Sequence, residues 1–138
     1  MSASFRLIDV RREDCIDYVT LNRPDVRNAV NDAVIAELTQ WAEAASADRE
    51  LRMAVLSGVG KTFCAGADID WMSRIVDHDQ EAHLHDAWAL ARLFTRLDAL
   101  PVPLVAGSTA RRSVAGSGWW PSVTLPWPPR TRCSGSPR

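Results

Sequence analysis

The sequence predicts an α/β fold over residues 1–107, because short apolar segments typical of strands alternate with amphipathic segments typical of helices. The helical segments span roughly 12–18 residues, a length that lets each helix cross between parallel strands. Residues 108–138 show no helical or strand periodicity, and their Pro, Gly, Ser and Arg content predicts an irregular or disordered segment. We therefore expect a folded domain over 1–107 and a different kind of segment over 108–138.

The elements of the first part are expected in chain order. Residues 5–10 and 15–21 alternate apolar and polar side chains around the charged turn RRED, which indicates a β-hairpin. Asn31, a favourable N-cap residue, precedes apolar residues at helical spacing that continue to about Ser46. The later elements are a buried strand at 53–58, a helix from about Ile69, a helix over about 80–97, and a short strand within LPVPLVA at 100–106.

Apolar side chains on these elements define the expected core. Trp41, Trp71 and Trp88 are interpreted as residues of the core or of its edge. The last helix is expected to present one apolar face made by Leu90, Leu93, Phe94 and Leu97.

Composition argues against several classes of protein. The formal net charge of −1 over 138 residues gives no reason to expect a nucleic-acid or membrane-surface partner. No run approaches the roughly 18 apolar residues needed to span a bilayer, and the first residues, MSASFRLIDV, lack a signal peptide's apolar stretch. His83 and His85 lie two residues apart and do not share a helical face, so we expect no metal site. The expected location is the cytoplasm.

Charge is distributed unevenly along the chain. Residues 1–107 carry eleven basic and all seventeen acidic residues, a formal charge of −6. Residues 108–138 carry five arginines and no acidic residue, a formal charge of +5, together with five of the eight prolines. Two such different compositions in one chain require an explanation.

The segment most informative about chemistry is KTFCAGAD, Lys61–Asp68, which follows the buried strand and precedes a helix. Its small residues allow a ligand to approach the backbone closely. Amides at a helix N-terminus are unpaired and lie in the positive end of the helix dipole, so they can stabilise a developing oxyanion. A plain strand-to-helix connection, with Asp68 as the N-cap of the helix from Ile69, explains the same residues.

Three motifs occur in order along the first part: LNRPDVRNAV at 21–30, TFCAGADIDWM at 62–72 and LPVPLVA at 100–106. In sequence, order and spacing they resemble the LNRP-x-x-x-NA, F-x-AGAD and LP-x-P-hydrophobic-A motifs of the enoyl-CoA hydratase/isomerase (crotonase) family. The resemblance implies the N-terminal portion of a spiral of ββα units, and a hydratase or isomerase acting on acyl-CoA thioesters in fatty-acid or branched-chain metabolism. Coenzyme A is then part of the substrate, and no cofactor is implied.

The resemblance also assigns expected site residues. In the family, two backbone amides hold the thioester oxygen as it becomes an enolate, and the motif match gives the first amide to Ala67. Arg27 and Ala29 are expected on the opposite wall, although Arg27 is equally explained as an exposed, solvated charge. The coenzyme A side is expected to be lined by Ala65, Gly66, Asp68 and Ile69.

The second half of the family's site does not appear in the sequence. After its third motif the family continues into HGAAxGGG, whose middle glycine donates the second amide, whereas this chain reads GSTARRSVAGSG from Gly107. No Asp or Glu follows Asp98, so the family's acid/base glutamates are absent too. We expect activity impaired by truncation; the alternative is a non-catalytic truncated fragment or pseudogene product. The resemblance implies a trimer-based homo-oligomer, which the missing segments leave unsupported in this chain.

A one-base shift of the reading frame explains the abrupt change. If each true codon joins the last base of one codon to the first two of the next, Thr109 permits His, Ala110 permits Gly, and Arg111 and Arg112 permit Ala. The shifted string then permits HGAALGGG at the family's distance from LPVPLVA. Gly118 permits no Glu at the position of the first hydratase glutamate, which leaves isomerisation or a hydratase subgroup.

Sequencing the gene across codons 105–110 tests this explanation. We expect one inserted or deleted base relative to the frame that encodes HGAALGGG, because a frame change alters the charge, proline content and tryptophan content together. An unambiguous, uninterrupted frame that encodes the present protein would refute it.

Overall fold

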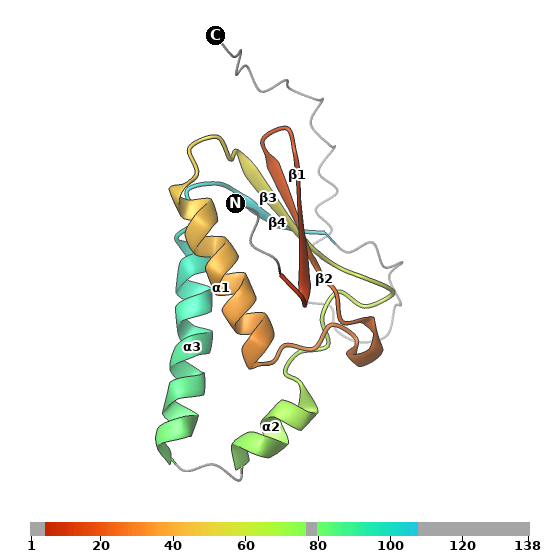
Figure 1. Ribbon diagram of the computed structural model, residues 1–138, viewed down its shortest axis with the longest axis vertical. Helices are drawn as coiled ribbons and strands as arrows, with labels where there is room; N and C mark the ends of the chain where they lie inside the picture. The colour runs from red at the N-terminus through yellow and green to blue at the C-terminus, as the bar shows by residue number, and fades with distance from the viewer. Residues whose placement is uncertain (1–4, 77–79, 108–138) are drawn as a thin grey trace, which may run out of the picture.

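The computed structural model describes residues 5–76 and 80–107 of the 138-residue chain. They form a four-stranded sheet in the order β1-β2-β3-β4 together with helices (Figure 1). The irregular structure expected for 108–138 lies outside the described residues. The elements are β1 (Ile8–Glu13), β2 (Ile16–Leu21), the 3-10 helix η1 (Pro24–Val26), α1 (Asp32–Ala47), β3 (Met53–Gly58), α2 (Ile69–Val76), α3 (Gln80–Asp98) and β4 (Leu104–Ala106).

β1 and β2 form the expected antiparallel hairpin, but the first strand is displaced along the sequence. β1 starts at Ile8 rather than Phe5 and continues through Arg11–Glu13, which we expected in the turn. The turn is instead tight, because Asp14 adopts a φ of 54°, a left-handed conformation that Asp tolerates better than most residues. The charged residues of β1 remain exposed, so pairing them to β2 buries no unpaired charge.

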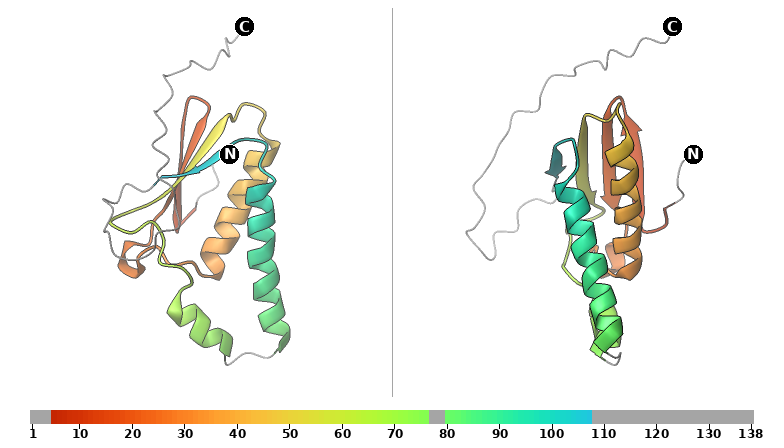
Figure 2. Two further views of the ribbon diagram at one scale, coloured as in Figure 1. Left: turned by 180° about the vertical axis from the view of Figure 1, so that it is seen from behind. Right: turned by 90° about the vertical axis from the view of Figure 1, so that its left-hand side faces the viewer.

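Two crossover connections make the rest of the sheet parallel, as the alternation of strands and helices predicts. α1 connects β2 to β3, while α2 and α3 connect β3 to β4, and both strand pairs are parallel. α1 and α3 lie side by side, and α2 lies beyond the end of the sheet (Figures 1 and 2). Because parallel strands share one direction, the C-terminal ends of β2, β3 and β4 lie at the same edge of the sheet.

The hydrophobic core is built by α1 and the two central strands. Val19 of β2 and Ala54 of β3 are completely buried, and Trp41 of α1 is 3% exposed. The indole N–H of Trp41 donates to the buried carboxylate of Asp17 with an N–O distance of 3.0 Å, so this core carboxylate has a partner. The other buried apolar residues of this cluster are Ile8, Leu21, Val34, Ile35, Leu38, Ala42, Ala45, Leu51, Trp71 and Leu93.

Two aromatic residues of α3 contradict the expected core. Trp88 is 72% exposed and Phe94 is 61% exposed, whereas Leu93 is buried and Leu90 and Leu97 pack partly against the core. The expectation for Trp88 was wrong because α3 turns the face of Leu93 inward, and five residues along a helix correspond to a rotation of about 140°. The other two tryptophans expected in the core are buried.

The architecture confirms the predicted α/β class. Helices cross between parallel strands, and the hairpin supplies the antiparallel pair. Within residues 5–76 and 80–107, no helix combines the length and the apolar character that crossing a membrane requires.

Glu37 of α1 binds the segment that leads into β1. Its carboxylate accepts hydrogen bonds from the amides of Arg6, Leu7 and Ile8 at 3.0, 2.9 and 3.1 Å. Glu37→Ala removes the acceptor for all three amides, two of which are partly buried. We expect the free energy of unfolding, measured by urea denaturation, to fall by about 1–3 kcal/mol.

Glu43→Ala is the matched control, since it removes a carboxylate from the same helix. Glu43 pairs with Arg92 at 2.7 Å and with Arg96 at 3.6 Å, but all three side chains are exposed. Exposed ion pairs contribute about 0–1 kcal/mol, so this variant is expected to unfold nearly as the unmodified chain does. Equal losses in the two variants would contradict the proposed anchoring by Glu37.

Candidate functional site

The candidate site lies where the segments that follow β2 and β3 meet. Leu21 at the end of β2 is paired with Gly58 at the end of β3, and the two strands are parallel. Residues 22–31 and 59–68 therefore leave the same edge of the sheet, the edge at which open α/β sheets commonly bind ligands. The LNRPDVRNAV and TFCAGAD motifs fall in these two segments, so the fold brings them together.

Among the described residues, an isolated parallel bridge between Val30 and Ala67 pairs the backbones of the two segments. The Val30 amide donates to the Gly66 carbonyl at 2.8 Å, and the Asp68 amide donates to the Val30 carbonyl at 2.9 Å. In a parallel pair with this pattern, the amide and carbonyl of Ala67 point away from Val30. The Ala67 N–H has no acceptor among residues 5–76 and 80–107, and Ala67 is exposed. On its outer side the loop thus presents a main-chain donor that no described residue pairs with.

Gly66 gives the loop its shape. Its φ is 97°, a conformation that side chains of L-residues rarely adopt. Apart from Gly66 and its two chain neighbours, no heavy atom of the described residues lies within 4 Å of the place where its Cβ would be, so the requirement for glycine is conformational rather than steric. The Gly66 amide faces Sγ of Cys64 at 3.4 Å, a contact within the loop itself.

Arg23 connects the two segments through its guanidinium group. Its Nη1 donates to the carbonyl oxygen of Ala29 at 2.6 Å, and its Nη2 donates to Oδ2 of Asp68 at 2.8 Å. Oδ1 of Asp68 accepts from the amides of Asp70 at 2.9 Å and Trp71 at 3.2 Å. The bond from Arg23, followed by the one from Trp71, holds the pKa of the Asp68 carboxyl below its usual range. The resulting stabilisation is present above the unfolded-state pKa and is lost as the pH falls through the lower folded value.

Asn28 fixes the start of the loop that follows β3. It is 1% exposed and has a φ of 57°. Its Nδ2 donates to the carbonyls of Val59 at 2.9 Å and Thr62 at 2.7 Å, and its Oδ1 accepts from the Arg23 amide at 2.9 Å. Gly58 leaves room for this arrangement, because a Cβ there would lie 2.7 Å from Nδ2 of Asn28 and 2.3 Å from a backbone oxygen.

The other residues expected at the site lie in or beside this junction. The Ala65 amide donates to the Arg27 carbonyl at 3.0 Å, so the two expected walls are joined directly. Arg27 is exposed, with a φ of 54°, whereas Ala29 is 7% exposed and offers its carbonyl to Arg23. Ile69, at the start of α2, is 78% exposed.

Asp68 is the N-cap that the plain strand-to-helix interpretation predicts. Its side chain is buried and occupied by α2 amides and by Arg23, so it reaches the loop surface only through its backbone. The cap uses the side chain of Asp68 and leaves the Ala67 amide free. Both interpretations of the KTFCAGAD segment are therefore compatible in one structure.

Arg23 and Asn28 are the residues of this junction to which sequence reasoning assigned no role. Both stand in the LNRPDVRNAV segment that carries the resemblance. Polar residues beside Pro24, in a segment that cannot continue the strand, signal side chains that replace ladder hydrogen bonds. Their partners in the segment after β3 lie 31 to 45 residues away, and the local pattern does not reveal them.

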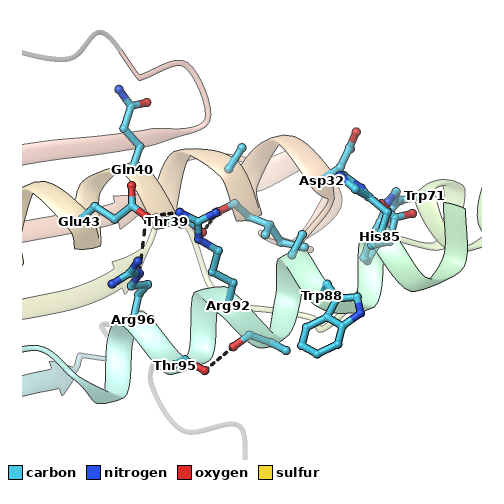
Figure 3. A pocket seen from close by; sticks show the side chains of 15 residues that line it. Asp32, Thr39, Gln40, Glu43, Trp71, His85, Trp88, Arg92, Thr95 and Arg96 are labelled. Carbon is cyan, nitrogen blue, oxygen red and sulfur yellow. Dashed lines mark hydrogen bonds and ion pairs between the residues drawn. The ribbon is translucent and has the colours of Figure 1, made fainter. Parts of the chain in front are cut away.

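A separate groove lies away from this junction. It has a volume of about 930 Å³ and is lined by residues of α1, α2 and α3, including the exposed Trp88. Arg92 and Arg96 of α3 reach across it to Glu43 of α1 (Figure 3). None of its lining residues belongs to the loop 61–69, so the groove and the junction are separate features.

No metal site was expected at His83 and His85. Both lie on α3 and are exposed. In the described part of the chain, no three His, Cys, Asp or Glu residues gather as a metal site requires. His78 lies outside the described residues.

Comparison with known proteins identifies the family. Residues 11–116 match the family model described as Enoyl-CoA hydratase/isomerase. A 2,3-dehydroadipyl-CoA hydratase of Escherichia coli (strain K12) is 37% identical over 97 residues, which are 70% of this chain and 36% of the relative. A mitochondrial Delta(3,5)-Delta(2,4)-dienoyl-CoA isomerase of Mus musculus is 35% identical over 97 residues, which are 64% of this chain and 30% of the relative. The chain therefore belongs to the enoyl-CoA hydratase/isomerase family.

Solved structures agree with this assignment. The crystal structure of an enoyl-CoA hydratase from Shewanella pealeana ATCC 700345 superposes with a TM-score of 0.71 at 31% identity, covering 74% of this chain and 38% of that one. This confirms the predicted crotonase-type fold. The chain spans well under half the length of these relatives. Because the family match ends at residue 116, the division expected at residue 107 stays a prediction.

Asn28→Ala tests the hydrogen bonds that hold the junction. Three backbone groups lose their partner and alanine tolerates the left-handed backbone less well, so we expect a loss of about 2–4 kcal/mol in the free energy of unfolding. Asn22→Ala, at an exposed position of the same segment, is the matched control and is expected to change it by less than about 0.5 kcal/mol. Urea denaturation of both variants measures the difference. A mild effect of Asn28→Ala would mean that the loop after β3 is held by other contacts.

Proposed function

We propose that this chain binds an acyl-CoA thioester with the thioester oxygen at the Ala67 N–H, and that this amide stabilises an enolate. When a proton leaves the carbon beside the carbonyl, its electron pair moves onto that oxygen. The observation that carries the proposal is the outward-directed amide of Ala67, which has no acceptor within residues 5–76 and 80–107. A donor held in place before the charge develops stabilises it without reorganisation, and one such donor is typically worth about 10²–10³ in rate.

The surroundings of Ala67 suit this substrate class. Ala65 and Gly66 are small and exposed, so a thioester can approach the main chain closely. The exposed side chain of Ile69 offers an apolar contact beside the proposed oxygen position. Arg27 is an exposed cation on the adjoining segment, suited to the phosphate groups of coenzyme A. Ala29 and Asp68 contribute indirectly, since their carbonyl and carboxylate anchor Arg23.

The site around Ala67 accounts for binding of the thioester and for stabilisation of the enolate's negative charge. It contains no residue to which we assign proton transfer. Residues 99–138 contain no Asp or Glu, and residues 107–118 do not match the family's second amide-donating motif. Coenzyme A enters as part of the substrate, so the reaction needs no cofactor. The relatives' names include both a hydratase and an isomerase, and both reactions are compatible with an enolate held at this amide.

A second candidate is a non-catalytic product of a shifted reading frame. The observation that favours it is the change of composition after Gly107, with five arginines, five prolines and no acidic residue. Under this proposal the chain retains a thioester-binding junction and has lost turnover. The two candidates share the Ala67 site and differ in whether the chain completes a reaction.

Ala67→Pro tests the proposed donor, because proline lacks the N–H. Butyryl-CoA and its thioether analogue S-butyl-CoA differ in the carbonyl oxygen, so the ratio of their dissociation constants isolates that contact. For the unmodified chain we expect the thioester to bind about fivefold more tightly, as one net hydrogen bond of about 1 kcal/mol requires. In Ala67→Pro we expect the two ligands to bind equally.

Ala67→Gly is the control, since it keeps the N–H and is expected to preserve the ratio. Equal binding of both ligands to the unmodified chain would contradict the proposed contact. Hydration of crotonyl-CoA by the same samples separates the two candidates. Turnover that Ala67→Pro abolishes would exclude the non-catalytic product, and thioester-selective binding without turnover would support it.

A further inference from the structure

The position of the Ala67 amide is set entirely by its neighbours. Ala67 makes no backbone hydrogen bond of its own within residues 5–76 and 80–107, whereas Gly66 and Asp68 on either side are bonded to Val30. The bridge consists of only these two hydrogen bonds, whereas paired strands normally continue the hydrogen bonds on both sides. The direction of the free N–H therefore depends on whatever keeps Val30 and Asp68 in register.

Arg23 is the side chain that connects both partners of this bridge. It binds the carbonyl of Ala29, next to Val30, and the carboxylate of Asp68, next to Ala67. A guanidinium presents several donors in one rigid plane, so it fixes the distance between two acceptors as a flexible ammonium cannot. Arg23 is itself anchored, because its amide donates to Oδ1 of Asn28.

The Arg23–Asp68 pair is shielded from water. The two side chains are 17% and 9% exposed. Shielding strengthens such a bond and makes its geometry more restrictive. The contact also extends to α2, since the second oxygen of Asp68 caps that helix.

We propose that Arg23 is a positioning residue for the Ala67 amide, acting through Asp68 and Ala29 to aim the N–H at the thioester oxygen. The inference rests on the proposed function for the ligand but not for the geometry. A purely structural role would stabilise the fold without affecting the aim of this one amide. The two roles separate experimentally, because the chain contains a comparable pair elsewhere.

Arg12 provides that comparison. It pairs with the buried Asp17 and with Asp48, at the opposite end of β2 from the junction. Arg12→Gln and Arg23→Gln each remove one guanidinium from a partly shielded ion pair. Both are expected to lower the thermal unfolding midpoint, and only Arg23→Gln is expected to affect the bridge.

Amide hydrogen exchange of the full chain, resolved by residue with NMR, measures the bridge without any ligand. We expect Arg23→Gln to speed the exchange of the Val30 and Asp68 amides by about tenfold or more relative to the amides of β2. Asp68→Asn, which retains a capping oxygen for α2 but loses the charge, is expected to act in the same direction. Equal relative exchange in the Arg23→Gln and Arg12→Gln variants would overturn the proposal.

The enolate absorbance of bound acetoacetyl-CoA reports whether the Ala67 N–H points at the ligand's oxygen. Acetoacetyl-CoA loses a proton to water and its enolate absorbs in the near ultraviolet, so absorbance at saturation reports how well the protein stabilises the oxyanion. We expect Arg23→Gln to reduce this signal by about tenfold or more, because stabilisation of the oxyanion depends on the position of the donor, while Arg12→Gln leaves the signal unchanged. An undiminished signal in Arg23→Gln would overturn the positioning role. A third outcome separates the two proposals: Arg23→Gln selectively speeds exchange at the bridge, but the unmodified chain gives no enolate signal. That outcome would refute the proposed function and uphold the positioning of the amide by Arg23.

Discussion

The parallel pairing of β2 with β3 is the constraint on which the rest of the structure depends. Leu21 and Gly58 end these strands side by side, so the segments that follow must leave the sheet together. α1 makes this pairing possible by returning the chain across the sheet, and it contributes more buried core residues than any other element. Apolar packing thus places the segments after β2 and β3 at the same edge of the sheet, but it does not determine how they lie relative to each other.

Polar side chains determine that position. At the junction the sheet is reduced to the Val30–Ala67 bridge, and Asn28 and Arg23 supply the hydrogen bonds that a ladder supplies elsewhere. Each such bond contributes about 1 kcal/mol net, whereas breaking one beside a buried group costs more. The arrangement is therefore specific without being strongly stabilising, which suits a loop that must hold one amide unpaired.

Local signals in the sequence predict the elements well and their contacts poorly. Asn31 was expected to begin a helix, and its Oδ1 does accept from the Val34 amide at 3.0 Å. The displaced start of β1 depends on Glu37, about 30 residues away. The exposure of Trp88 depends on how α3 is rotated against its neighbours, which periodicity alone leaves undetermined. The three motifs correctly predicted the family, and two of them lie in the segments that form the junction. They did not reveal that the Arg23 side chain connects those two segments.

The group proposed to meet the substrate belongs to the main chain, and this has a consequence for genetics. Nearly any side chain at position 67 leaves an N–H in place, so a scan of substitutions finds that position permissive. Intolerance would appear at Asn28, where three backbone groups converge, and at Gly58, where a Cβ has no room. Damaging variants would thus cluster at the residues that position the amide, while position 67 itself would show few of them.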